Sequence, residues 1–296
     1  VAVEDILKNI QKVIGTSADD TLYGNSYANV FIGGAGNDTI DAREGNDTIY
    51  GISGNNKLYG GTEKDTIYGG TGNDTLDGGA GDDILDGSLG GNNTYIGGTG
   101  NDTLWGGNGI DTLYYATSES GITYTLVNNT SDINGNFGTV SSSTDGDDIL
   151  KTHFERLIAT NYLDIIDLIN TQAGNSTILG YGGADTIYSS IGFDDTIFGG
   201  DANDLIYANG GNNSYYGGNA TINGSGVITG STSSGDDRVS YSLATSAINV
   251  DLSVTANTTT SNVTVNGFGG QDKLYDITRI TGSNFERKRI SYSICR

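Results

Sequence analysis

Aspartate recurs along much of the chain at an interval of nine residues, and asparagine replaces it at a few of these positions. The positions are Asp20, Asn29, Asp38, Asp47, Asn56, Asp65, Asp74, Asp83, Asn93, Asp102 and Asp111, with one extra residue near Leu89. Carboxylate and carbonyl oxygens are the ligands of hard cations such as Ca²⁺, which take about six to eight of them. One aspartate per repeat is too few, so we expect neighbouring repeats to share each ion.

Bulky apolar residues predict the elements that position these aspartates. One follows each position by two places: Leu22, Phe31, Ile40, Ile49, Leu58, Ile67, Leu76, Leu85, Tyr95, Leu104 and Leu113. A three-residue strand has one inward side chain, so we expect a short strand around each of them. The residues between strands form turns. Their glycines, such as Gly34, Gly36, Gly70 and Gly72, allow backbone angles closed to other residues and let carbonyl oxygens converge.

The repeat has a recognisable form. Residues 33–41 read GGAGNDTID, 69–77 read GGTGNDTLD and 97–105 read GGTGNDTLW. This resembles G-G-x-G-x-D-x-U-x, the calcium-binding nonapeptide of the repeats-in-toxin (RTX) haemolysin-type family. The resemblance implies an all-β fold: a parallel β-roll, a right-handed solenoid with two nonapeptides per coil. Each Ca²⁺ would lie between a turn and the turn two repeats later.

Carried over to this chain, the resemblance assigns metal-binding partners. The pairs are Asp20 with Asp38, Asp47 with Asp65, Asp65 with Asp83, and Asp83 with Asp102. Asn29, Asn56 and Asn93 depart from the pattern, so we expect their sites to bind calcium weakly or not at all. Asp65 would serve two successive sites, and its replacement should cost more than that of Asp111 at the end of the series.

A second, looser array follows. Its aspartate positions hold Asp164, Ser176, Asp185, Asp195, Asp204 and Asn213, and its core positions hold Ile166, Ile178, Ile187, Ile197, Ile206 and Tyr215. Because fewer of its turns keep the glycines and the aspartate, we expect it to hold fewer ions.

Segments outside the arrays lack the glycine period and alternate apolar with polar residues, so we expect antiparallel β-strands that cap or extend the roll. The expected order is a junction (1–14), a first roll (15–114), a flank and junction (115–159), a degenerate roll (160–222), a flank and junction (223–283) and a tail (284–296). In the tail, Arg287 and Arg289 stand where the register requires an acid and an apolar residue. The related junctions suggest an excerpt from a longer tandem protein.

Composition narrows the function. The chain has 48 Gly and no Pro. Its formal charge of -22 would make it repel itself unless cations neutralise it. We expect no transmembrane segment, since no apolar run approaches the roughly 20 residues that span a bilayer, and no nucleic-acid partner. The single histidine, His153, and the single cysteine, Cys295, have no evident catalytic partner in the sequence. We therefore expect no enzyme activity.

These observations favour a secreted calcium-binding structural or adhesive protein, such as a component of an S-layer, surface filament or extracellular matrix. The resemblance implies type I secretion and an extracellular or cell-surface location. Self-association or binding to cell-surface glycans would provide its partners. Outward aromatic residues, such as Tyr50, Tyr68 and Trp105, suit sugar or protein binding but are also good strand formers. Two alternatives are the calcium-dependent secretion region of a larger exoenzyme or toxin, and a carbohydrate-binding module.

Overall fold

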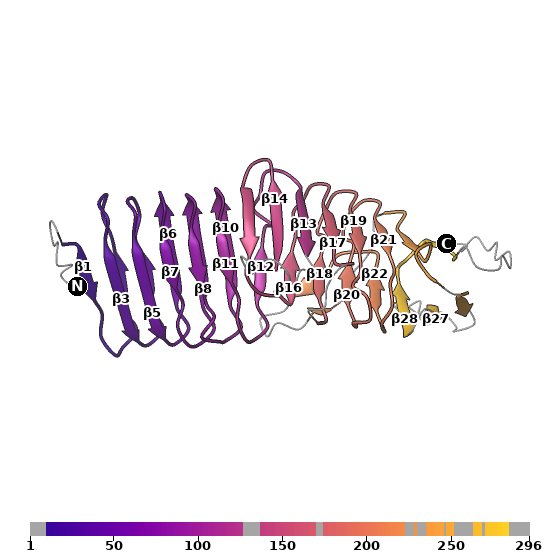
Figure 1. The fold of residues 1–296 in the computed structure, drawn as a ribbon, viewed down its shortest axis with the longest axis horizontal. Coiled ribbons are helices and arrows are strands. Elements are labelled where there is room, and N and C mark those ends of the chain that lie inside the picture. Colours follow the sequence, from indigo (N-terminus) through magenta and orange to yellow (C-terminus); the bar gives the residue numbers. More distant parts are fainter. Residues whose placement is uncertain are drawn as a thin grey trace. The chain divides into compact units, whose positions relative to one another are not determined.

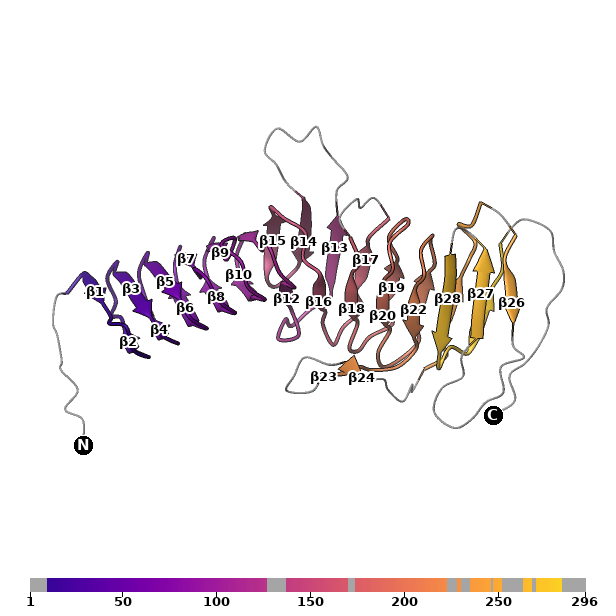
Figure 2. The same cartoon turned by 90° about the horizontal axis from the view of Figure 1, so that it is seen from below.

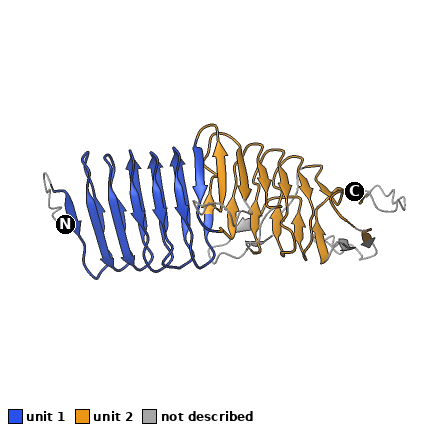
Figure 3. Ribbon diagram, in the orientation of Figure 1, with its two compact units in different colours: residues 1–112, 145–152 blue, residues 113–144, 153–296 orange. Residues whose placement is uncertain are grey.

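The computed structural model describes residues 10–126, 137–169, 174–222, 228–229, 235–245, 247–251, 263–267 and 270–283. The chain divides into two compact units (Figure 3): residues 1–112 with 145–152, and residues 113–144 with 153–296. Every regular element among the described residues is a β-strand, so the all-β prediction is confirmed. Within those residues no helix is long and apolar enough to cross a bilayer.

Unit 1 is a stack of parallel strands in two sheets (Figure 1). One sheet has the odd-numbered strands β1 (Lys12–Ile14), β3 (Val30–Ala35), β5 (Thr48–Ser53), β7 (Thr66–Tyr68), β9 (Ile84–Asp86) and β11 (Thr103–Trp105), followed by β15 (Gly146–Leu150). The other has the even-numbered strands β2 (Thr21–Tyr23), β4 (Thr39–Asp41), β6 (Lys57–Thr62), β8 (Thr75–Ala80) and β10 (Thr94–Thr99). Each coil contributes one strand to each sheet, which is the predicted parallel β-solenoid.

The predicted core residues hold unit 1 together. Phe31, Ile40, Ile49, Leu58 and Ile67 are fully buried, and the next two core residues are buried as completely. Each apolar side chain stabilises the fold by about 1.5–3 kcal/mol when fully buried. Equivalent residues pair across coils, Phe31 with Ile49 and Ile49 with Ile67, so the core is a regular column of side chains.

The one-residue slip near Leu89 is absorbed in a turn. Thr75 pairs with Thr94 and Ile84 with Thr103, a shift of one residue from the register before it. Leu89 itself is 73% exposed. The core residues on both sides of the slip therefore stay in place.

Several strands are longer than the predicted three residues. The six-residue strands β3, β5, β6, β8 and β10 each continue through the first three residues of the turn. In β8 and β10, Gly79 pairs with Gly98 and Ala80 with Thr99. Gly79 and Gly98 have φ angles of 96° and 98°, and this left-handed backbone turns the corner while the pairing between coils continues.

Unit 2 repeats this arrangement with antiparallel additions (Figure 2). Its odd sheet pairs β13 (Ile122–Leu126), β17 (Ile165–Asp167), β19 (Thr186–Tyr188), β21 (Leu205–Tyr207), β25 (Arg238–Ser240) and β29 (Arg279–Thr281) in parallel. Its even sheet pairs β16 (Arg156–Ile158), β18 (Thr177–Leu179), β20 (Thr196–Phe198), β22 (Ser214–Tyr216) and β28 (Gly270–Tyr275) in parallel. The strand β12 (Thr112–Tyr114) contains the boundary between the units.

The flanking segments form antiparallel strands, as predicted. In unit 2, β14 (Gly138–Ser142) pairs with β13, and β26 (Asn249–Asp251) and β27 (Val263–Gly267) lead to β28. A small hairpin joins β23 (Thr221–Ile222) to β24 (Ile228–Thr229). Since β13 and β28 also pair in parallel with roll strands, the flanks extend the sheets of the roll.

Aromatic rings stack between coils on the outer faces. Tyr50 and Tyr68 lie 4.9 Å apart with an interplanar angle of 6°, and Phe198, Tyr216 and Tyr275 form a ladder with centroid distances of 4.3 and 4.2 Å. In unit 2, Leu179 and Phe198 are buried on the outer side of the even sheet, with Ala220 packed against them. Because these rings stack face to face across neighbouring coils, they contribute to the stability of the sheets.

The aberrant tail and the start of the first junction lie outside the described residues. Arg287 and Arg289 belong to that tail, so the broken register there stays a prediction.

Candidate metal sites

The aspartate positions form two rows in each unit, because equivalent residues of successive coils stack. We call a position part of the odd or even row when it stands two residues before the core residue of an odd- or even-numbered strand. In unit 1 the odd row is Asn29, Asp47, Asp65, Asp83, Asp102 and Asp148, and the even row is Asp20, Asp38, Asn56, Asp74, Asn93 and Asp111. In unit 2 the odd row is Asp164, Asp185, Asp204 and Asp237, and the even row is Glu155, Ser176, Asp195, Asn213 and Asp272.

Within the rows, apart from Glu155 and Ser176, one side-chain oxygen of each residue accepts a hydrogen bond from the backbone N–H of the residue before it. The Asp47 N–H donates to Asp65 Oδ1 at 2.7 Å, and the Asp65 N–H donates to Asp83 Oδ1 at 2.7 Å. The other predicted pairs, Asp20 with Asp38 and Asp83 with Asp102, are joined in the same way. The structure therefore places the predicted pairs next to each other.

The second carboxylate oxygen of many row aspartates is buried and accepts no hydrogen bond from the described residues. These oxygens are the Oδ2 atoms of Asp38, Asp47, Asp65, Asp74, Asp83, Asp102, Asp185 and Asp204. A buried carboxylate oxygen without a donor is costly, and a bound cation is one way to compensate it.

Backbone carbonyls line the same space. A methyl group built on Gly60 would lie 2.4 Å from Asp65 Oδ2 and 2.7 Å from the Gly78 carbonyl oxygen, and one on Gly78 would lie 2.4 Å from Asp83 Oδ2. No three acidic, histidine or cysteine side chains cluster among the described residues. A cation bound here would therefore also use backbone carbonyl oxygens as ligands. An oxygen-only donor set of this kind fits Ca²⁺.

The glycines predicted at the turns have the backbone that this geometry needs. Gly34, Gly36, Gly70 and Gly72 have φ angles of 115°, 113°, 95° and 121°. A side chain at Gly34 would meet the Thr16 carbonyl oxygen at 2.0 Å. Glycine thus provides both the left-handed conformation and the close approach of successive coils.

Burial changes the acidity of the row aspartates. The pKa of Asp65 is raised to about 7, chiefly by desolvation and to a smaller extent by the carboxylates of Asp83 and Asp47, against the opposing hydrogen bond from the Asp47 backbone. Desolvation likewise raises the pKa of Asp185 to about 9 and that of Asp204 to about 7. When no metal ion is bound, the raised pKa values favour the protonated form of these carboxyl groups.

Asparagine positions are satisfied differently. Asn56 Nδ2 donates to the Gly54 carbonyl at 3.3 Å, and Asn93 Nδ2 donates to the Gly87 carbonyl at 3.2 Å. Asn29 Nδ2 donates in the same way to the Ile10 carbonyl. The amide thus presents a donor where aspartate presents an oxygen, which agrees with weaker calcium binding; that weaker binding stays a prediction.

Three row aspartates, and Glu155 in the even row of unit 2, were not predicted from the sequence. Asp148, Asp237 and Asp272 are buried, and their Oδ1 atoms accept from Asp102, Asp204 and Asn213 across separations of 46, 33 and 59 residues. Those insertions hide them from a search for a nine-residue period. The local signature of an aspartate two residues before an apolar residue identifies them.

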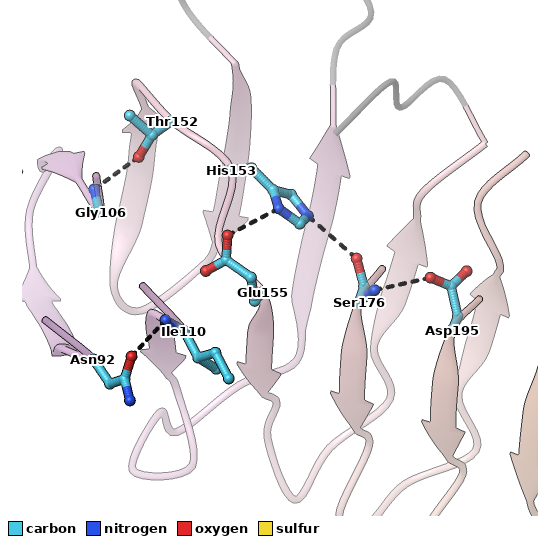
Figure 4. A network of polar contacts seen from close by, with 8 residues as sticks. All are labelled: Asn92, Gly106, Ile110, Thr152, His153, Glu155, Ser176 and Asp195. Carbon is cyan, nitrogen blue, oxygen red and sulfur yellow. Dashed lines mark hydrogen bonds and ion pairs between the residues drawn. The ribbon is translucent and has the colours of Figure 1, made fainter. Parts of the chain in front are cut away.

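His153, for which the sequence offers no evident catalytic partner, makes two polar contacts in the structure (Figure 4). Its Nδ1 lies 3.3 Å from Glu155 Oε1, and its Nε2 lies 3.3 Å from Ser176 Oγ. These residue types could form a nucleophilic triad, but Ser176 is only 3% exposed and its N–H already binds Asp195. A substrate has no access to that hydroxyl.

Replacing Gly78 by alanine should lower calcium affinity by about tenfold, about 1.4 kcal/mol. The new methyl group would lie 2.4 Å from Asp83 Oδ2 and 2.6 Å from the Gly97 carbonyl, so the two oxygens must separate. Isothermal titration calorimetry with Ca²⁺ measures the change. Gly182→Ala is the control, because its methyl group meets nothing closer than 3.6 Å. Equal losses in both variants would contradict the role of this space.

Comparison with known sequences agrees with this geometry. The sequence profile of the RTX calcium-binding nonapeptide repeat matches residues 14–49, 50–85, 87–117, 164–194 and 192–220, which together make up more than half of the chain. A search of curated proteins finds no significant match. The profile matches cover most positions of both arrays, where the oxygen-lined rows lie. The chain belongs to the RTX calcium-binding nonapeptide repeat family.

Proposed function

We propose that this protein is a secreted structural or adhesive component of a bacterial surface layer, filament or matrix, and that Ca²⁺ bound along its rows makes it rigid. RTX repeats characterise calcium-binding proteins of the type I-secreted kind, and the β-roll is a structural repeat domain. The observation that carries the proposal is the series of buried Asp Oδ2 atoms without a donor, which recurs in both units.

The residues that would hold the ions follow from the geometry. In unit 1 they are the row aspartates with their turn carbonyls, such as Asp65 with the Gly78 carbonyl, and in unit 2 they include Asp185 and Asp204. Bound Ca²⁺ would neutralise the carboxylates and link one coil to the next. The formal charge of -22 would keep the ion-free chain open, which suits export before folding.

Calcium should convert the chain from an open to a β-rich state, and the folded protein should then assemble. Circular dichroism during titration with Ca²⁺ follows the first step, and negative-stain electron microscopy of the same samples detects sheets or filaments. Mg²⁺ at the same concentrations is the control, because it demands stricter octahedral geometry and dehydrates reluctantly.

Each step can fail separately. A β signal that is unchanged by chelation would contradict calcium-dependent folding. A calcium-loaded protein that stays monomeric at high concentration would contradict the structural role and favour a secretion region attached to an exoenzyme or toxin.

A further inference from the structure

In the even row of unit 2, protein groups satisfy the side chains of every member from Asp195 onward. Asp195 Oδ1 accepts from the Ser176 N–H at 2.9 Å, and its Oδ2 accepts from the N–H and the hydroxyl of Ser190 at 2.8 and 2.7 Å. Ser190 stands in the turn, in a stretch where most repeats have glycine. Both oxygens of this carboxylate are therefore bound by the protein itself.

Groups of the protein also satisfy the side chains of the next two members of the row, Asn213 and Asp272. Asn213 accepts from the Asp195 N–H at 2.8 Å and donates through Nδ2 to the Asn209 carbonyl at 3.2 Å. Asp272 Oδ1 accepts from the Asn213 N–H at 2.9 Å, and its Oδ2 accepts from the Tyr241 hydroxyl at 2.8 Å. An amide and a phenol thus supply the donors along this part of the row.

The first members of the row hold a histidine (Figure 4). Ser176 provides no carboxylate, and the His153 ring joins its hydroxyl to Glu155, with both contacts at 3.3 Å. The His153 side chain is 10% exposed. The His153 ring therefore links these two positions of the row through contacts within the protein.

In the odd row of the same unit, Asp164 is also satisfied, since its Oδ2 accepts from the Thr160 N–H at 2.9 Å and its Oδ1 from the Thr160 hydroxyl at 2.8 Å, but the next two members are not. Asp185 Oδ2 and Asp204 Oδ2 are buried and accept no hydrogen bond from the described residues. A methyl group on Gly180 would lie 2.6 Å from Asp185 Oδ2 and 2.1 Å from the Gly199 carbonyl. At Asp185 and Asp204 the Oδ2 atom therefore has no protein donor, unlike the Oδ2 atoms of Asp195 and Asp272.

We propose that the even row of unit 2 binds no calcium and is closed by His153, Ser190, Asn213 and Tyr241, so that calcium enters unit 2 along its odd row, at Asp185 and Asp204. This inference rests on the proposed calcium binding of the chain. An ion in the even row would have to displace donors that already satisfy the carboxylates, whereas an ion in the odd row compensates oxygens that have none. One side of unit 2 is therefore held by contacts that do not depend on calcium.

The test compares two matched substitutions in the whole chain, Asp185→Asn and Asp195→Asn. Equilibrium dialysis against Ca²⁺ counts the ions bound per chain, and circular dichroism confirms that both variants fold in calcium. Asp185→Asn should lose at least one ion, and Asp195→Asn should bind as many ions as the wild type. Loss of an ion in Asp195→Asn would overturn the inference, whereas a wild-type chain that binds no calcium would instead overturn the proposed function.

A second variant guards against misfolding of Asp195→Asn. Tyr241→Phe removes only the hydroxyl that donates to Asp272 Oδ2. In saturating Ca²⁺ we expect its thermal midpoint to fall by about 2–4 °C with the full number of ions retained. A loss of ions in Tyr241→Phe would show that calcium occupies this row and would overturn the inference.

Discussion

Replacing Asp65 by asparagine should cost up to two bound calcium ions, whereas the same change at Asp74 should cost at most one. Asp65 lies in the odd row of unit 1 between Asp47 and Asp83, and each neighbour is an aspartate joined to it by a backbone hydrogen bond of 2.7 Å. An ion on either side can therefore use the Asp65 carboxylate. Equilibrium dialysis against Ca²⁺ measures the stoichiometry of each variant.

Asp74 is a close control because its local geometry is the same and its row neighbours are not. Its Oδ2 is buried without a donor, like that of Asp65, but it stands between Asn56 and Asn93 in the even row. Both asparagines donate their amides to turn carbonyls. Equal losses of calcium from Asp65→Asn and Asp74→Asn would contradict the sharing of ions between successive coils.

The nine-residue period predicted the short strands and the core residues, and the resemblance to the RTX repeat added the solenoid with two repeats per coil and the pairing of the aspartates. A fixed period places equivalent residues on top of one another, so Phe31 must meet Ile49 once the coils stack. The two-repeat coil that the resemblance implies paired Asp47 with Asp65 in the same way. The spacing then fixes which residues of successive coils meet.

Contacts between residues that are far apart in the sequence could not be predicted from the nine-residue period. Asp148 joins the odd row of unit 1 after an insertion that separates it from Asp102 by 46 residues. Likewise, Tyr241 reaches Asp272 Oδ2 from 31 residues away, and a search for repeats gives no reason to connect them. Such contacts determine whether a carboxylate oxygen is available to a cation or already accepts a hydrogen bond.

The ion-free chain should gain stability as the pH falls from about 8 to about 4. Desolvation raises the pKa of Asp65 and Asp204 to about 7, and of Asp47 and Asp83 to about 6, above the ordinary value of 3.8. Between the unfolded and folded pKa values the folded state binds more protons than the unfolded state, so its stability falls as pH rises. Below about pH 4 both states are protonated and the gain ends.

Circular dichroism of chelated, desalted protein across this pH range measures the effect as recovery of the β signal on acidification. Saturating Ca²⁺ at pH 8 provides the folded reference, because calcium then compensates the same oxygens that protons compensate in acid. The double variant Asp65→Asn, Asp83→Asn is the control for the cause. It removes two of the raised carboxyl groups, so its stability should depend less steeply on pH than that of the wild type. An unchanged slope would assign the pH dependence to general charge repulsion instead of these buried aspartates.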